Sequence, residues 1–169
     1  TWYAHSARIL PWRQQPTPYR VWVSEIMLQQ TRVEAVKSYY QRFLEALPDV
    51  KALAGAEEDQ LLKLWEGLGY YNRVRNMQKA ATQIMVDYGG EFPQTYEEIL
   101  NLTGIGSYTA GAISSFAFGL AKPAVDGNVL RVISRITGSD RDIMKQSVRK
   151  RMETLLEQVI PADASSDFN

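Results

Sequence analysis

Two carboxyl groups in this chain have surroundings that favour opposite charge states. Glu25 lies within residues 21–28, where nearly every neighbour is apolar, and loss of hydration raises the pKa of a carboxyl group. Asp126 precedes Gly127 and Asn128, where the start of a helix would supply N–H donors and keep the side chain ionised. A neutral carboxylic acid together with a carboxylate is the pair that cleaves glycosidic bonds. The sequence predicts this pair, provided that the two groups meet in space.

Each carboxyl group also has a purely structural interpretation. Glu25 could be a buried glutamate that an arginine or a backbone donor satisfies. Asp126 could be an ordinary helix N-cap. Both interpretations stay open, because the sequence does not show whether the two side chains lie together.

Composition restricts the other kinds of chemistry. The chain has 169 residues, no cysteine and one histidine, which excludes disulfides and thiolate metal sites and leaves little scope for imidazole chemistry. Its net charge is zero, but acidic residues prevail between residues 45 and 66 and basic residues between 131 and 151. One end could therefore face a polyanion while the other faces solvent. No apolar run approaches the roughly 20 residues that span a bilayer, so no membrane is expected.

Two glycine-containing turns could contact nucleic acid. Gly104 and Gly106 flank one apolar residue before a predicted helix, an arrangement that exposes backbone N–H groups to a phosphate. The aromatic loop 67–71 and the amides of residues 29–30 could wedge between bases when one base is extruded. They could equally be a packed loop and a helix end. Arg73 and Arg75, just beyond the loop, could hold phosphates or face water.

Helical spacing recurs along the chain, whereas no sustained alternation predicts a strand. We therefore expect an all-α protein. Helix starts are predicted at Thr17, at Thr31 through a capping box with Glu34, and at Thr95 through a second capping box. The expected helices run from 18 to about 29, from 32 to 47, from 51 to 56, from 57 to 66, from 71 to 88, from 96 into the hairpin, from 107 to 118, from 127 onward, and from 144 to 159.

Together, these residues resemble adenine DNA glycosylases of the MutY type, within the helix-hairpin-helix glycosylase superfamily related to endonuclease III. The resemblance covers nearly the whole chain and is most specific in the block that contains Glu25. The matching motifs are Leu10-Pro11-Trp12-Arg13, Pro18-Tyr19, Trp22-Val23-Ser24-Glu25-Ile26-Met27-Leu28-Gln29-Gln30-Thr31, Gly67-Leu68-Gly69-Tyr70-Tyr71, Arg75-Asn76, Gly104-Ile105-Gly106, Tyr108-Thr109-Ala110 and Val125-Asp126-Gly127-Asn128-Val129.

The resemblance implies a role for each site residue. Glu25 would protonate a flipped adenine and later manage the attacking water. Asp126 would stabilise the oxocarbenium-like sugar or bond to it transiently, supported by Tyr108 and Asn128. The implied contacts with DNA and substrate are made by Trp12, Arg13, Leu28, Gln30, Thr31, Leu68, Gly69, Tyr70, Gly104 and Gly106.

Tyr108 stands where related bifunctional glycosylases carry a lysine nucleophile. Tyrosine cannot form a Schiff base, so we expect monofunctional hydrolysis without a dedicated strand-cutting step. The resemblance also implies an ion near a phosphate, held by the backbone around Leu100, Leu102 and Ile105, and no metal held by side chains. Thr103 replaces the usual proline of the family, which should loosen the hairpin slightly.

The family binds a four-iron, four-sulfur (4Fe-4S) cluster through four cysteines that follow a Phe-Asn element, and this chain stops at Phe168-Asn169. We therefore expect no cofactor within the chain and a cluster in a longer parent protein. The parent is expected to be a monomer that excises adenine opposite 8-oxoguanine from double-stranded DNA. Its expected location is the bacterial cytoplasm, at the nucleoid. The fragment by itself could be inactive.

Two modules are expected. The first is a six-helix barrel with the hairpin over residues 11–118, and the second is an incomplete iron-sulfur module from residues 1–10 and 119–169, with the active cleft between them. Two other functions stay open: a thymine or other mispair glycosylase of the same fold, and a non-enzymatic DNA-binding helical module. Carboxylates lying far apart would favour the second alternative.

Overall fold

The computed structural model of the chain describes residues 5–169. All regular elements in this range are helices, which confirms the predicted all-α class. The helices are α2 (Pro11–Gln14), α3 (Pro18–Leu28), α4 (Val33–Ala46), α5 (Val50–Ala54), α6 (Glu58–Trp65), α7 (Asn72–Asp87), α8 (Tyr96–Leu100), α9 (Ser107–Phe118), α10 (Gly127–Thr137), α11 (Gln146–Val159) and α12 (Ser165–Phe168). Among the described helices, none has the length and apolar character to cross a bilayer.

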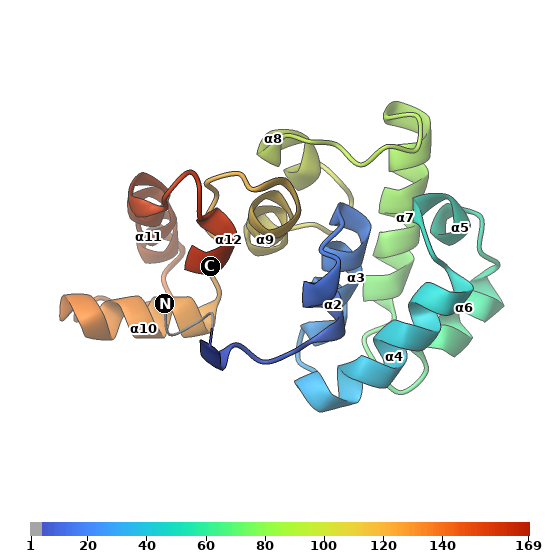
Figure 1. The fold of residues 1–169 in the computed structure, drawn as a ribbon, viewed down its shortest axis with the longest axis horizontal. Coiled ribbons are helices and arrows are strands. Elements are labelled where there is room, and N and C mark those ends of the chain that lie inside the picture. Colours follow the sequence, from blue (N-terminus) through green and yellow to red (C-terminus); the bar gives the residue numbers. More distant parts are fainter. Residues whose placement is uncertain (1–4) are drawn as a thin grey trace.

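The buried apolar side chains form two clusters. The larger cluster draws on α2 to α9 and includes Trp22, Phe43 and Trp65. The smaller one joins α10, α11 and the segment before α10. Figure 1 shows α4 to α7 on one side, α10 and α11 on the other, and α9 and α12 between them. The division into modules at residues 11–118 and 119–169 stays a prediction, and residues 1–4 of the second module lie outside the described range.

Helix α3 lies inside the larger cluster, where it packs against α9, α4 and α2. It begins as predicted at Thr17, whose side chain accepts a hydrogen bond from the Arg20 N–H at 3.3 Å. From Tyr19 to Met27 every residue except Arg20 is buried. A helix that is enclosed on all sides forces any carboxyl group it carries out of water. This packing sets the environment of Glu25.

Helix α9 begins and ends where the sequence predicts, and Gly119 closes it in the left-handed conformation with φ 67°. At Gly111 a Cβ atom would lie 2.1 Å from the Pro123 carbonyl oxygen, so only glycine permits this close approach. Tyr108 and Gly111 are three residues apart and share one face of the helix. The segment that leads to Asp126 therefore passes along the α9 face that carries Tyr108.

The side chain of Asn169 fastens the same segment from the other side. Its Nδ2 donates to Ser115 Oγ at 2.9 Å and to the Lys122 carbonyl at 3.1 Å, and its Oδ1 accepts from the Ala124 N–H at 2.9 Å. These bonds join α9 to the chain just before α10. The segment that leads to Asp126 is thus held by the close approach at Gly111 and by the hydrogen bonds of Asn169.

Several helices begin one or two residues from the predicted start, and two of these differences have a visible cause. The capping box at Thr31 is wrong: Arg32 is the N-cap of α4 and caps with no side-chain bond. The chain turns through a left-handed Gln30, with φ 59°, so Thr31 lies outside the helix and its hydroxyl donates to the Gln29 carbonyl at 3.4 Å. The last long helix begins at Gln146 rather than at residue 144. The reason is a turn in which Asp142 accepts from the Met144 N–H at 2.9 Å.

Candidate active site

The three acidic and phenolic groups of the predicted centre meet between α3, α9 and the start of α10. Glu25 is 8% exposed, and the Tyr108 hydroxyl donates a hydrogen bond to its carboxyl group. The charge of Asp126 acts on both Glu25 and Tyr108. Residues separated by about a hundred positions in the chain therefore form one electrostatic cluster, because α3 packs directly against α9.

Burial is the largest influence on the pKa of Glu25. Loss of water raises its pKa, and the negative charge of Asp126 raises it further, whereas the hydrogen bond from Tyr108 and the positive charge of Arg13 lower it. Burial also raises the pKa of Tyr108, followed in effect by the charge of Glu25, so the phenol keeps its proton. A carboxyl group whose pKa is raised can hold a proton near neutral pH and deliver it to a leaving group.

Asp126 is the N-cap of α10, as the sequence predicts. Its Oδ1 accepts from the Val129 N–H at 2.8 Å, and its Oδ2 accepts from Asn128 Nδ2 at 3.0 Å. Asn128 is itself held by Arg131, whose Nη2 donates to the Asn128 Oδ1 at 3.2 Å. Both carboxylate oxygens thus have donors, and the positive end of α10 faces the negative charge. Asn128 contacts Asp126 directly, whereas the charge of Asp126 acts on Tyr108 across space.

The residues implied at an adenine pocket differ in how far they are buried. Trp12 is 7% exposed and meets Tyr40 edge to face at 5.4 Å, so most of its ring serves the core. Arg13 is exposed, donates to the Arg8 carbonyl at 3.2 Å and places its charge near Glu25. Leu28, the last residue of α3, is half-buried.

The residues implied at the opened base stack lie on two tight turns. Gln30 and Tyr70 have φ of 59° and 49° and are the non-glycine residues with positive φ in the described range. Such backbone costs about 1–3 kcal/mol and tends to mark functional sites. Both side chains are exposed, Tyr70 by 69%. Leu68 is buried in the core instead, while Gly69 adopts φ 69° and completes the turn.

Sequence reasoning missed the role of Arg73. It was expected to hold phosphates or to face water, but its guanidinium donates to four backbone carbonyls of α3 and of the loop before α7. Arg75 pairs with Glu58 at 2.9 Å. The available signal was the loop itself: a tight glycine turn leaves carbonyls without helix partners, and these require donors from elsewhere.

The hairpin leaves the start of α9 open. A Cβ atom on Gly104, with φ 77°, would lie 2.8 Å from Asn76 Cβ, whereas nothing lies within 4 Å of a Cβ on Gly106. Gly106 is exposed and is the N-cap of α9 without a side-chain bond, and the Ser107 hydroxyl beside it donates to Glu153 Oε1 at 3.1 Å. The N–H groups in the first turn of a helix have no partners within the helix and can bind an anion. Leu102 and Ile105 are buried, and Leu100 is 37% exposed. An ion on their backbone stays a prediction, and within residues 5–169 no acidic, His or Cys side-chain cluster could hold a metal.

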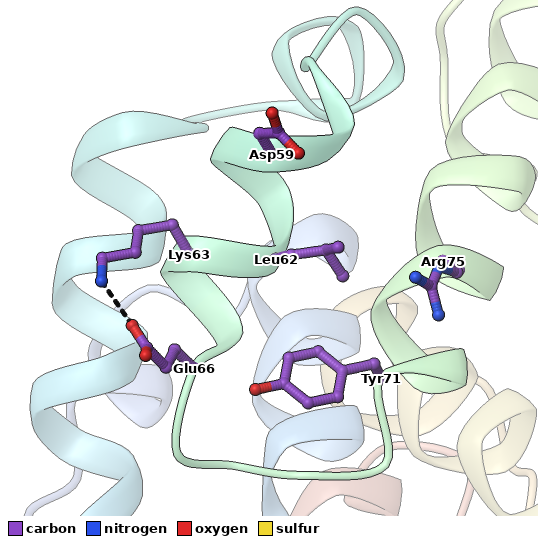
Figure 2. A pocket seen from close by; sticks show the side chains of 6 residues that line it. All are labelled: Asp59, Leu62, Lys63, Glu66, Tyr71 and Arg75. Carbon is purple, nitrogen blue, oxygen red and sulfur yellow. Dashed lines mark hydrogen bonds and ion pairs between the residues drawn. The ribbon is translucent and has the colours of Figure 1, made fainter.

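A hollow of about 510 Å³ lies elsewhere, between α6 and the start of α7. Figure 2 shows Lys63 and Glu66 paired on one side of it and Tyr71 and Arg75 on the other. Tyr71 of the aromatic loop and Arg75 line it, but Glu25, Tyr108 and Asp126 do not. Lys63 pairs with Glu66 and Arg75 pairs with Glu58, so most of the charged side chains at this hollow have a surface partner.

Comparison with known proteins agrees with the geometry. The family model of "HhH-GPD superfamily base excision DNA repair protein" matches residues 23–158. The chain is 41% identical over 169 residues to an adenine DNA glycosylase of Buchnera aphidicola (subsp. Baizongia pistaciae), covering 99% of this chain and 48% of that protein. It is 40% identical over 178 residues to the adenine DNA glycosylase of Homo sapiens, covering 100% and 33%. The chain therefore spans half or less of the length of these relatives.

Solved structures show the same fold. A thermostable thymine-DNA glycosylase matches with a TM-score of 0.89 and 29% identity, covering 99% of this chain and 77% of that one. Endonuclease III in a non-covalent DNA complex matches with a TM-score of 0.76 and 28% identity, covering 89% and 69%. The resemblance to MutY-type adenine DNA glycosylases is confirmed, and the chain belongs to the HhH-GPD superfamily of base excision DNA repair proteins.

Proposed function

We propose that this chain carries the active site of a DNA glycosylase that removes adenine from a mispair by hydrolysis. The observation that carries the proposal is the buried Glu25, which has a raised pKa, is bound by Tyr108 and lies under the influence of Asp126. One carboxyl group favours its neutral form, and the other is held by N–H donors. This is the division of labour that glycosidic cleavage requires.

The chemistry follows from these positions. Glu25 donates its proton to a ring nitrogen of adenine, and the bond between the base and C1′ breaks with its electrons moving to the base. The sugar acquires positive charge, which the carboxylate of Asp126 stabilises. Water then adds to C1′ and gives a proton to Glu25. The products are neutral adenine and an abasic site, and the enzyme returns to its starting protonation state.

Tyr108 supports hydrolysis without strand cleavage. A neighbouring solved structure is described as a trapped covalent intermediate between endonuclease III and DNA. A covalent Schiff base needs an amine nucleophile, and the residue that contacts Glu25 at the start of α9 is a phenol. We therefore infer a monofunctional reaction for this chain.

Double-stranded DNA is the proposed partner. Solved relatives are complexes with DNA, and the open N-terminus of α9 offers N–H groups to a phosphate. The same proposal covers three properties of a longer parent protein: it recognises 8-oxoguanine opposite the adenine, it is a monomer, and it is located at a bacterial nucleoid. A 4Fe-4S cluster is proposed for the parent alone, because this chain has no cysteine to bind it and the reaction above needs none.

The competing function is excision of thymine, which the match to a thymine-DNA glycosylase over 99% of this chain favours. The test is single-turnover base release from three duplexes that contain A:8-oxoguanine, A:G or T:G, with this chain and with the parent protein. We expect adenine release that Glu25→Gln abolishes and that Glu34→Gln preserves, since Glu34 pairs with Lys37 on the surface. Release of thymine alone would support the competitor, and binding without any release would support a non-enzymatic module.

A further inference from the structure

Arg73, near the start of α7, joins two segments that are distant in the sequence. Its Nη1 donates to the carbonyls of Ile26 at 2.8 Å and Gln29 at 2.7 Å, at the end of α3. Its Nη2 donates to the carbonyls of Leu68 at 3.0 Å and Gly69 at 3.2 Å, in the loop between α6 and α7. Because both terminal nitrogens are engaged with the protein backbone, this guanidinium is a structural fork rather than a free phosphate ligand.

Two of these four carbonyls directly precede the strained residues of the site. The carbonyl of Gln29 precedes Gln30, and the carbonyl of Gly69 precedes Tyr70. Gln30 and Tyr70 are the non-glycine residues with positive φ among residues 5–169. The carbonyl of one residue shares a rigid peptide plane with the N–H of the next. Fixing that plane restricts the φ of the following residue. Arg73 therefore holds both left-handed residues in a conformation that an L-amino acid seldom adopts.

The fork is itself fixed from two sides. The Arg73 guanidinium carbon lies 5.4 Å from the ring centre of Trp65 and 5.7 Å from that of Tyr70. Trp65 is fully buried and its Nε1 donates to the Gly69 carbonyl at 3.1 Å. The backbone N–H of Arg73 also donates to the Tyr70 carbonyl at 2.9 Å. The loop thus closes on Arg73, and Tyr70 presents its outer face to solvent.

We propose that Arg73 is a positioning residue that fixes the backbone at Gln30 and Tyr70 in a defined relative position. Both side chains can then enter the gap left in a DNA base stack when a base is extruded. The inference rests on the proposed function, in which these two side chains meet the opened stack. It assigns the arginine no contact with DNA. A lysine keeps the positive charge, but its single ammonium group cannot reach four carbonyls from one plane.

The experiment compares Arg73→Lys with Arg42→Lys. Arg42 also stacks on an aromatic ring, at 4.7 Å from the centre of Tyr39, and is exposed. The dissociation constant is measured by fluorescence anisotropy for a duplex with a tetrahydrofuran abasic analogue and for the same duplex intact. We expect Arg73→Lys to lose about tenfold in preference for the abasic duplex, with binding of the intact duplex changed by less than about twofold. Arg42→Lys should keep the preference.

Further variants separate positioning from a general loss of structure. Arg73→Lys should add no further loss in a chain that already carries Gln30→Ala and Tyr70→Ala. Arg73→Gln, whose shorter side chain has one terminal nitrogen and no charge, should lose at least as much preference as Arg73→Lys. Circular dichroism at the binding temperature confirms that each variant is helical. An equal loss on both duplexes, an unchanged preference, or no preference in the unaltered chain would overturn the proposal.

The same experiments distinguish a failure of the proposed function from a failure of the role proposed for Arg73. The abasic duplex contains no bond for the enzyme to cleave at the tested position, so the binding preference does not depend on adenine release. An unaltered chain that prefers the abasic duplex but releases no adenine would contradict the proposed reaction and leave the role of Arg73 intact. A chain that releases adenine while Arg73→Lys keeps its full preference would contradict the role of Arg73 alone.

Discussion

Removal of the Tyr108 hydroxyl would test what sets the charge of Glu25. Burial is the largest influence on the Glu25 pKa and raises it, while the hydrogen bond from Tyr108 lowers it. Tyr108→Phe keeps the ring and removes only the donor. The pKa of Glu25 should therefore rise, and its carboxyl group should remain protonated to a higher pH than in the unaltered chain.

The size of the effect follows from the bond that is lost. A hydrogen bond to a charged acceptor contributes about 1.5–3 kcal/mol, and one pKa unit corresponds to about 1.4 kcal/mol. The pKa of Glu25 should thus rise by about 1–2 units. A general acid works only while it is protonated, so the rate of adenine release in single turnover should fall at a correspondingly higher pH. Carbon-13 NMR of the Glu25 carboxyl group, assigned by its absence in Glu25→Gln, gives the same midpoint without catalysis.

Tyr96→Phe is the matched control. Tyr96 is another half-buried tyrosine with a raised pKa, but the charges that act on it after burial are those of Glu153, Glu157 and Glu97. Its replacement should leave the midpoint of Glu25 unchanged. If Tyr108→Phe leaves that midpoint in place or moves it down, the hydrogen bond does not stabilise the charged form, and the reasoning about this centre is refuted.

Three other outcomes are expected. Glu25→Gln should raise the free energy of unfolding only above the pKa that a glutamate has in the unfolded chain. The gain should grow by about 1.4 kcal/mol per pH unit until the raised pKa of the folded state is reached. A melting temperature that Glu25→Gln leaves unchanged at every pH would contradict this. Asp126→Asn should lower the Glu25 pKa in the NMR titration, because it removes a like charge; a rise would exclude that coupling. Gly111→Ala should cost about 1–3 kcal/mol in denaturant unfolding through its clash with Pro123. Gly106→Ala, which meets open space, should cost much less.

Much of the fold was predictable because its signals are local. Thr17 and Thr95 cap α3 and α8 as predicted, and Gly119 ends α9, since each cap involves donors or carbonyls within one helical turn. The capping box at Thr31 failed for a non-local reason. Gln30 in the preceding turn has a left-handed conformation, and the carbonyl of Gln29 accepts a hydrogen bond from Arg73 of α7. No pattern near residue 31 predicts that contact.

In the candidate site too, local features were predictable and contacts between distant segments were not. The apolar run around Glu25 predicted burial, and the Asp126-Gly127 step predicted an N-cap; both are observed. Their proximity was not predictable from the residues, because it depends on the packing of α3 against α9 and on the close approach at Gly111. Leu68 also illustrates the limit: its neighbours suggested a DNA-facing loop, but its side chain is buried.

The sequence by itself determined the helical class, the ends of most helices, and the two residues suited to be acid and carboxylate. These depend on periodicity, caps and local polarity, which act within a few residues. Only the tertiary structure decided that Glu25, Tyr108 and Asp126 form one electrostatic cluster. It also decided that Arg73 binds two carbonyls 47 and 44 residues away, together with two carbonyls of the loop that precedes it. Desolvation and hydrogen bonding between distant segments arise only after the helices pack, and these two effects give the candidate site its chemistry.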